Sequence, residues 1–94
     1  MITHVVMWKF KPNTEKEQER FLTGLKALYG VIPEIKAQEV HVSAVPNADY
    51  DAILISKFDS LETLNAYKVD PRHMAVADIC KSIRTIRSAF DFEA

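Results

Sequence analysis

Tyr67 and His73 are the side chains of this sequence whose types and spacing could perform acid–base chemistry. Both lie in the segment YKVDPRHMAVAD, which covers residues 67–78. A neutral imidazole can accept a proton, and a nearby phenol can donate one to a carbonyl oxygen or polarise that oxygen. Such a pair could therefore act on a carbonyl group.

The same segment also has the features of a helix start, which need no function. Asp70 suits the N-cap position and Pro71 the first helical position, so that the Asp70 carboxylate could accept the backbone N–H of His73. The positive end of the helix dipole favours a neutral imidazole, whereas Asp70 favours a charged one. By residue type alone, an inward histidine or tyrosine more often serves as a hydrogen-bonded core residue, so both interpretations stay open.

The other candidate residues give weaker signals. His4 lies on an apolar strand face and could line the same layer as His73, while His41, beside Glu39, is predicted to be solvated. Three separated histidines without a carboxylate pattern do not predict a metal site. Cys80 falls on an apolar helical stripe, which indicates a packing thiol. The sequence has no phosphate-binding glycine loop and no dinucleotide fingerprint, and we expect neither cofactor nor metal.

Length and charge limit the function classes. The 94 residues are expected to form a single domain over residues 1–94, and 48% hydrophobic with 27% charged residues is typical of a soluble globular protein. Twelve basic and 13 acidic residues give a net charge of −1, which predicts no nucleic acid and no membrane as a partner. With a single cysteine, no span-length apolar run and no secretory signal, we expect a cytoplasmic protein.

The hydrophobic pattern predicts the order β-α-β-β-α-β. Asp59 and Glu62 are predicted to form a capping box for a short helix, Asn13 or Thr14 to cap the first helix, and Gly30 to end it. Two right-handed β-α-β units predict an α+β, ferredoxin-like sandwich, in which a four-stranded antiparallel sheet carries its helices on one face. The expected strands cover 2–11, 35–45, 50–58 and 84–93, the expected helices 15–29 and 71 to about 83, and a turn covers 46–49.

The second face of this sheet is predicted to be apolar. Val5, Met7, Ile53 and Ile55 would form much of it. Monomers seldom expose a contiguous apolar patch larger than a few hundred Å², and a second sheet is the natural cover. We therefore expect a homodimer that packs sheet against sheet, as a dimeric α/β barrel.

Four segments together resemble the stress-responsive dimeric α/β-barrel family (Dabb). They are the opening ITHVVMWKFK, the central YDAILISKFDSLETLNAY, the later VDPRHMAVAD and the terminal FDFE, which occur in the family's order over nearly the whole chain. The family includes plant stress proteins, many uncharacterised bacterial proteins and a cofactor-free polyketide cyclase that uses a tyrosine and a histidine in an aldol reaction. The resemblance implies the same dimeric fold and a possible small-molecule ligand.

The resemblance also implies site residues. Tyr67 and His73 match the tyrosine–histidine pair of the cyclase, and His4 matches the histidine of the family's opening strand. The expected pocket lies between the helices and the sheet. Its expected lining is His4, Val6, Trp8, Leu22, Leu54, Val76, Ala77 and Arg84.

The chain departs from the family at several positions. Asp70 replaces the first histidine of the usual His-Pro-x-His motif, whose second histidine is His73. Ala52 replaces a third-strand histidine of the cyclase, and Arg84 and Arg87 replace aromatic and aliphatic pocket residues. These changes predict a smaller, more polar pocket, in which an arginine could favour an anionic ligand.

Three functional hypotheses follow. The first is a cofactor-independent enzyme or small-molecule binder, with Tyr67 as acid, His73 as base and His4 as pocket lining. The second is a non-catalytic stress-response or interaction module, in which the same residues brace the bend between helices. The third is a cofactor-free monooxygenase of a related dimeric barrel type. A cavity that touches both the Tyr67 hydroxyl and a nitrogen of His73 would favour the first hypothesis over the second.

Overall fold

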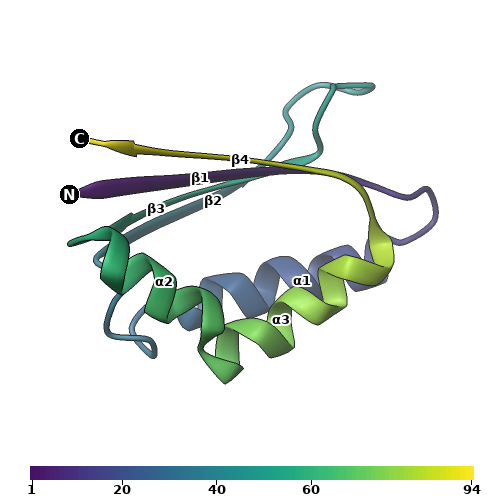
Figure 1. Cartoon of the computed structure of the whole chain (residues 1–94). Helices are drawn as coiled ribbons and strands as arrows, with labels where there is room; N and C mark the ends of the chain where they lie inside the picture. Colours follow the sequence, from purple (N-terminus) through teal and green to yellow (C-terminus); the bar gives the residue numbers. More distant parts are fainter.

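A four-stranded sheet with three helices on one of its faces makes up the chain (Figure 1). The computed structural model describes residues 1–94. The strand order is β2-β3-β1-β4, and every neighbouring pair is antiparallel. This arrangement confirms the predicted α+β, ferredoxin-like fold. The elements are β1 (Ile2–Phe10), α1 (Glu15–Leu28), β2 (Ala37–Val42), β3 (Ala52–Phe58), α2 (Leu61–Val69), α3 (Pro71–Ile83) and β4 (Arg84–Glu93).

The strands β2 and β3 are shorter than the predicted strands 35–45 and 50–58. The chain between the two strands projects beyond the sheet as a loop (Figure 1), and Asn47 within it has a φ of 58°. Asp51 lies just before the regular strand: its backbone still bonds Trp8 and Ser43, and its carboxylate accepts the backbone N–H of Phe10 at 2.8 Å and the Lys9 ammonium at 3.2 Å. Tyr50 and Asp51, expected in the strand, therefore belong to the loop.

The predicted residues occupy the expected positions at both ends of α1, whereas the capping box of α2 lies one residue later than predicted. Gly30, with a φ of 88°, lies just past the end of α1, as expected. Thr14 occupies the N-cap position of α1, but its hydroxyl donates to the Lys11 carbonyl and does not cap the helix. At α2 the capping box consists of Ser60 and Thr63, one residue later than the predicted Asp59 and Glu62, because the hydroxyl of Ser60 accepts the N–H of Thr63 at 3.2 Å.

Asp70 separates α2 from α3 and caps α3 as predicted. Its backbone is extended, with φ −63° and ψ 129°, because the proline ring disfavours the helical region for the residue before it. Its carboxylate accepts the N–H of Arg72 at 2.8 Å, so the expected bond to His73 is wrong by one residue. The Asp70 break turns α3 away from α2, which positions the start of α3 beside the end of α2.

The core lies between the helices and the inner face of the sheet. The even-numbered residues of β1 alternate into this layer, from Ile2 to Phe10. Trp8 meets Phe21 of α1 edge to face at 5.0 Å between ring centroids. α3 packs mainly against α1, whereas both faces of the edge strand β4 are largely exposed. Space therefore remains between α3 and β4.

The opposite face of the sheet is apolar, as predicted. Val5 is paired with Ile55 on one side and Phe90 on the other, which places all three side chains on this face. Met7 and Ile53 are paired in the same way. Phe90 and Phe92 enlarge the face, with exposed fractions of 68% and 42%. We call these residues the open sheet face.

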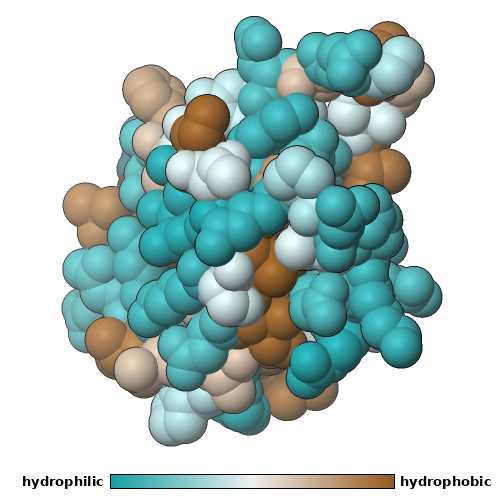
Figure 2. Space-filling model, turned by 90° about the vertical axis from the view of Figure 1, so that its right-hand side faces the viewer, coloured by the Kyte–Doolittle hydropathy of each residue, from teal (hydrophilic) through white to brown (hydrophobic).

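One further side of the molecule has a mostly polar surface. Figure 2 views the molecule from the side that lies at the right of Figure 1, and hydrophilic residues surround a narrow strip of hydrophobic ones there. None of the three helices combines the length and the apolar character needed to cross a bilayer.

Candidate functional site

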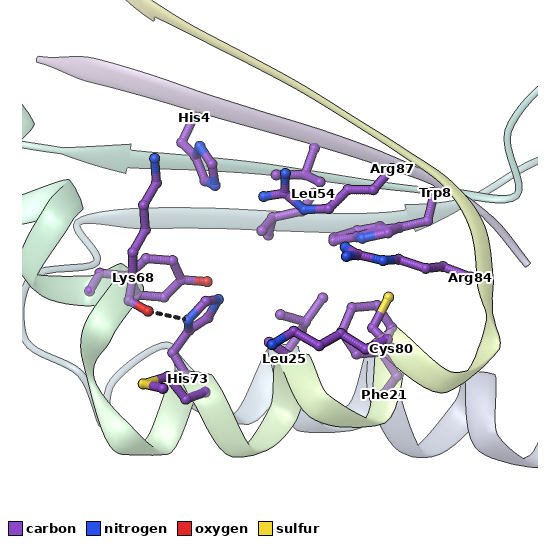
Figure 3. Close-up of a pocket in the computed structure, with 15 residues that line it drawn as sticks. His4, Trp8, Phe21, Leu25, Leu54, Lys68, His73, Cys80, Arg84 and Arg87 are labelled. Atoms are coloured by element: carbon purple, nitrogen blue, oxygen red, sulfur yellow. Dashed lines mark hydrogen bonds between the residues drawn. The ribbon is translucent and has the colours of Figure 1, made fainter.

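A cavity of about 370 Å³ lies between the helices and the inner face of the sheet (Figure 3). Its volume falls within the range of roughly 300–1,000 Å³ that is usual for small-molecule sites. The side chains come from β1, β3, β4 and all three helices. The lining residues are His4, Val6, Trp8, Phe21, Leu25, Leu54, Tyr67, Lys68, His73, Met74, Ala77, Cys80, Lys81, Arg84 and Arg87.

Six of the eight residues expected to line the pocket do so, and Leu22 and Val76 do not. Val76 faces α1, where it packs against Gly24 so closely that a larger residue than glycine would displace it. Leu22 is partly buried against the core. Both lie on apolar helix faces that are wide enough to contact the core and the cavity at the same time. The sequence alone does not show which residues of such a face line the cavity.

Tyr67 and His73 are brought together by the break at Asp70. Their rings are tilted by 43° and their centroids lie 4.3 Å apart. Tyr67 is almost fully buried, yet its hydroxyl has no hydrogen-bond partner in the protein. Burial raises the pKa of Tyr67 to about 12, so the phenol remains protonated at neutral pH. The hydroxyl is therefore available as a donor to a molecule in the cavity.

One ring nitrogen of His73 is hydrogen-bonded within the protein, and the other is free. Its Nδ1 lies 3.1 Å from the Lys68 carbonyl oxygen, one of the last carbonyls of α2, which have no partner within the helix (Figure 3). A carbonyl can only accept, so Nδ1 carries the proton and Nε2 keeps its lone pair. Burial lowers the pKa of His73, which favours the neutral imidazole. The free Nε2 is thus a proton acceptor at the cavity.

His4 reaches the cavity from the opposite wall (Figure 3). Its cross-strand partner is Asp91 of β4, whose carboxylate accepts the N–H of His4 Nδ1. Asp91 also lies 3.9 Å from the Lys68 ammonium. Burial lowers the pKa of His4, and the hydrogen bond to Asp91 partly opposes this effect. The pair with Asp91 fixes the His4 ring and leaves its Nε2 free.

Asp91 is a residue that the sequence analysis missed. Its pairing with His4 depends on the register between the first and last strands, and hydrophobic alternation does not specify that register. His41, in contrast, is exposed and lies 3.2 Å from Glu39, away from this cavity.

Basic side chains occupy the cavity lining together with apolar ones. Lys68, Lys81, Arg84 and Arg87 all contribute, and no carboxylate does. Of these four, only Arg84 and Arg87 were expected near the pocket. Cys80 also lines it, but burial raises the pKa of its thiol to about 11, which agrees with an inert packing role. Phe21, Leu25 and Met74 complete the apolar wall beyond the predicted set.

The arrangement provides a buried O–H donor and two imidazole acceptors around one space. Tyr67 lies 4.3 Å from His73 and 6.4 Å from His4, measured between ring centroids. Such a set can polarise a carbonyl oxygen and remove a proton from the neighbouring carbon. The fold assembles no group of three or more histidine, cysteine, aspartate or glutamate side chains that could hold a metal ion.

Comparisons with known proteins identify a matching family and a relative of similar length. Residues 2–94 match the family described as Stress responsive A/B Barrel Domain (Dabb). Olivetolic acid cyclase from Cannabis sativa is 27% identical over 96 aligned positions, which cover 97% of this chain and 94% of the cyclase.

Two solved structures show the same fold. A dimeric ferredoxin-like protein of unknown function from Bacteroides fragilis superimposes with a TM-score of 0.89 at 26% identity, over 99% of this chain and 95% of that one. Hydroxynitrile lyase from Passiflora edulis gives a TM-score of 0.84 at 16% identity, over 97% of this chain and 90% of the lyase.

Proposed function

The chain belongs to the stress-responsive A/B barrel domain (Dabb) family, and we propose that its cavity binds a small carbonyl compound and catalyses cofactor-independent acid–base chemistry on it. One observation carries this proposal. The Tyr67 hydroxyl has no partner in the protein, and His73 keeps one free nitrogen at the same cavity. A filled core would have satisfied the hydroxyl or enclosed it.

Each residue has a defined role in the proposed reaction. Tyr67 donates a hydrogen bond to the carbonyl oxygen and stabilises the negative charge that develops there. His73 accepts a proton at Nε2 from the carbon beside the carbonyl and returns it to the product. His4, held by Asp91, lines the opposite side and limits where the carbonyl compound can lie. A cyclase among the relatives supports this class of reaction.

A non-catalytic role for the same residues also has an observation in its favour. The bond from His73 Nδ1 to the Lys68 carbonyl joins the end of α2 to the first turn of α3. It therefore stabilises the bend at Asp70, whatever the cavity binds. In this alternative the protein is a stress-response or interaction module, and substitutions at His73 change stability only.

A thermal-shift screen against small ketones, aldehydes and carboxylic acids separates these alternatives. A ligand that binds only the folded protein raises its stability by about 2.7 kcal/mol at 100 times its dissociation constant. We expect at least one carbonyl compound to stabilise the protein, and the shift to vanish in folded Tyr67→Phe and His73→Ala variants. An unchanged shift in both variants would contradict the proposed site, and His41→Ala serves as the matched control.

We also propose that the chain forms a homodimer through the open sheet face. This face carries Val5, Met7, Ile53, Ile55 and Phe90 in adjoining rows. Isolated monomers rarely leave so many large apolar side chains side by side. The Bacteroides fragilis protein of the same fold is dimeric, which supports the proposal.

A further inference from the structure

Arg84 and Arg87 differ from the other cations near the cavity because neither has a partner within the chain. Lys68 lies 3.9 Å from Asp91 and Lys81 lies 3.4 Å from Asp78. Arg72, on the outer surface, is fully engaged with the Asp70 carboxylate and the Val31 carbonyl. The guanidinium groups of Arg84 and Arg87 line the cavity without an ion pair or a hydrogen bond.

A strand irregularity explains why both arginines face the cavity. Residues three apart on a regular strand point to opposite faces of the sheet. Between Lys9 and Phe10 the register shifts, so that Lys9 is paired with Ile86 but Phe10 with Arg84. Thr85 is thereby skipped, and Arg84 and Arg87 both turn to the inner face (Figure 3). The bulge thus doubles the positive charge that β4 presents to the cavity.

Arg87 lies within electrostatic reach of the polar end of the cavity. Burial is the largest influence on the pKa values of His4, Tyr67 and His73, but the charge of Arg87 also acts on all three. Arg84 and Arg87 both act on the pKa of Cys80, further along α3, where burial is again the largest influence. Arg87 is paired with Trp8 and Arg84 with Phe10, so the two guanidinium groups lie along the part of the cavity that Trp8 lines. No carboxylate of the lining neutralises them.

We propose that the substrates of this site are small carbonyl-bearing carboxylates, which Arg84 and Arg87 select by their charge. The apolar body of the substrate packs against Trp8, Phe21 and Leu25, and its carboxylate binds the two guanidinium groups. The carbonyl group then lies at Tyr67 and His73. This inference rests on the proposed function and adds the chemical class of the substrate. The guanidinium fork matches the two oxygens of a carboxylate, which makes the recognition geometric as well as electrostatic.

A matched pair of probes tests the selection by charge. Hydrocinnamate and hydrocinnamamide have nearly the same shape, but only the first carries a carboxylate. In calorimetric titrations of the full chain at low ionic strength, we expect the acid to bind at least about tenfold more tightly than the amide. This preference should shrink when salt is added, since the arginines are partly exposed.

Arginine variants locate the selection. We expect Arg87→Gln and Arg84→Gln each to weaken hydrocinnamate binding by about tenfold, with little change for hydrocinnamamide. Arg20→Gln, on α1 outside the cavity, is the matched control. Arg87→Lys keeps the charge but loses the fork, and should retain part of the preference. Circular dichroism of each variant confirms that the protein is folded.

The outcomes separate this inference from the proposed function. Equal affinity for acid and amide, or acid binding that neither arginine variant weakens, would overturn the inference even if a neutral ketone such as acetophenone binds at Tyr67 and His73. The converse result is a preference for the acid that both arginine variants abolish, together with acetophenone binding that is absent or unchanged in Tyr67→Phe and His73→Ala. It would support the selection by charge and contradict the proposed acid–base role.

Discussion

The ring of His73 lies 4.3 Å from the ring of Tyr67, centroid to centroid, across a break between two helices. The two side chains meet because Asp70 is extended before Pro71, so α3 starts in a new direction beside the end of α2. A continuous helix would place residues six positions apart on different faces. The break at Asp70 and Pro71 therefore both starts α3 and brings Tyr67 and His73 together.

The first prediction concerns the Tyr67 hydroxyl. Because this group has no hydrogen-bond partner in the protein, Tyr67→Phe should change the free energy of unfolding by less than about 1 kcal/mol. A satisfied core tyrosine would lose more than this. Urea denaturation followed by circular dichroism measures the difference. A large loss of stability would show that the hydroxyl has a structural role, and would remove the main support for the site.

The second prediction concerns the support that Asp91 gives to His4. The carboxylate opposes the lowering of the His4 pKa by burial. In Asp91→Asn the His4 pKa should therefore fall further, because desolvation stays and the negative partner is lost. Imidazole resonances followed by NMR against pH report the value directly. An unchanged or higher pKa in Asp91→Asn would contradict the pairing, and Asp78→Asn, on the outer surface, is the control.

The third prediction concerns stability against pH. The pKa of His73 is lowered in the folded protein from its usual 6.5, mainly by burial, and that of His4 is lowered in the same way. The unfolded chain then binds more protons below about 6.5, so both histidines cost stability as the pH falls from 6.5 toward 5. Urea midpoints across this range should decline. The decline should be shallower in His73→Gln, whereas His41→Gln should match the original protein.

The fourth prediction concerns the open sheet face. Phe90→Glu places a charge on the open sheet face, within the proposed dimer interface, and we expect it to convert a dimer into a monomer at micromolar concentration. Sedimentation velocity distinguishes the two species. Leu61→Glu, at an exposed site at the start of α2, should remain dimeric. A monomer of the original sequence at that concentration would exclude the proposed dimer.

Much of the fold follows from local patterns. Alternation along β1, the helical stripes and the Asp70–Pro71 start predict the correct elements, since each depends on neighbours within a few residues. The capping box was misplaced by one residue because Asp59 and Ser60 are both good caps, and only the hydrogen bond from the Thr63 amide shows which one is used.

The site was less accessible to sequence reasoning. The pairing of His4 with Asp91 and the position of Arg87 depend on the register between β1 and β4, including a bulge at Thr85 that no sequence pattern marks. The cavity itself exists because α3 packs mainly on α1 and leaves space beside β4. How closely α3 approaches α1 depends on the size of the side chains at their contact, such as Gly24 and Val76.

Hydrogen exchange at the carbon beside a carbonyl tests the central claim most directly. Phenylpyruvate in deuterated buffer can be followed by NMR, and we expect the protein to accelerate the exchange above the rate in buffer. The acceleration should fall by about 100-fold or more in Tyr67→Phe and in His73→Gln, and stay unchanged in His41→Gln. Exchange at the buffer rate with phenylpyruvate bound, or equal acceleration by all three variants, would contradict the assignment of Tyr67 and His73 as an acid–base pair.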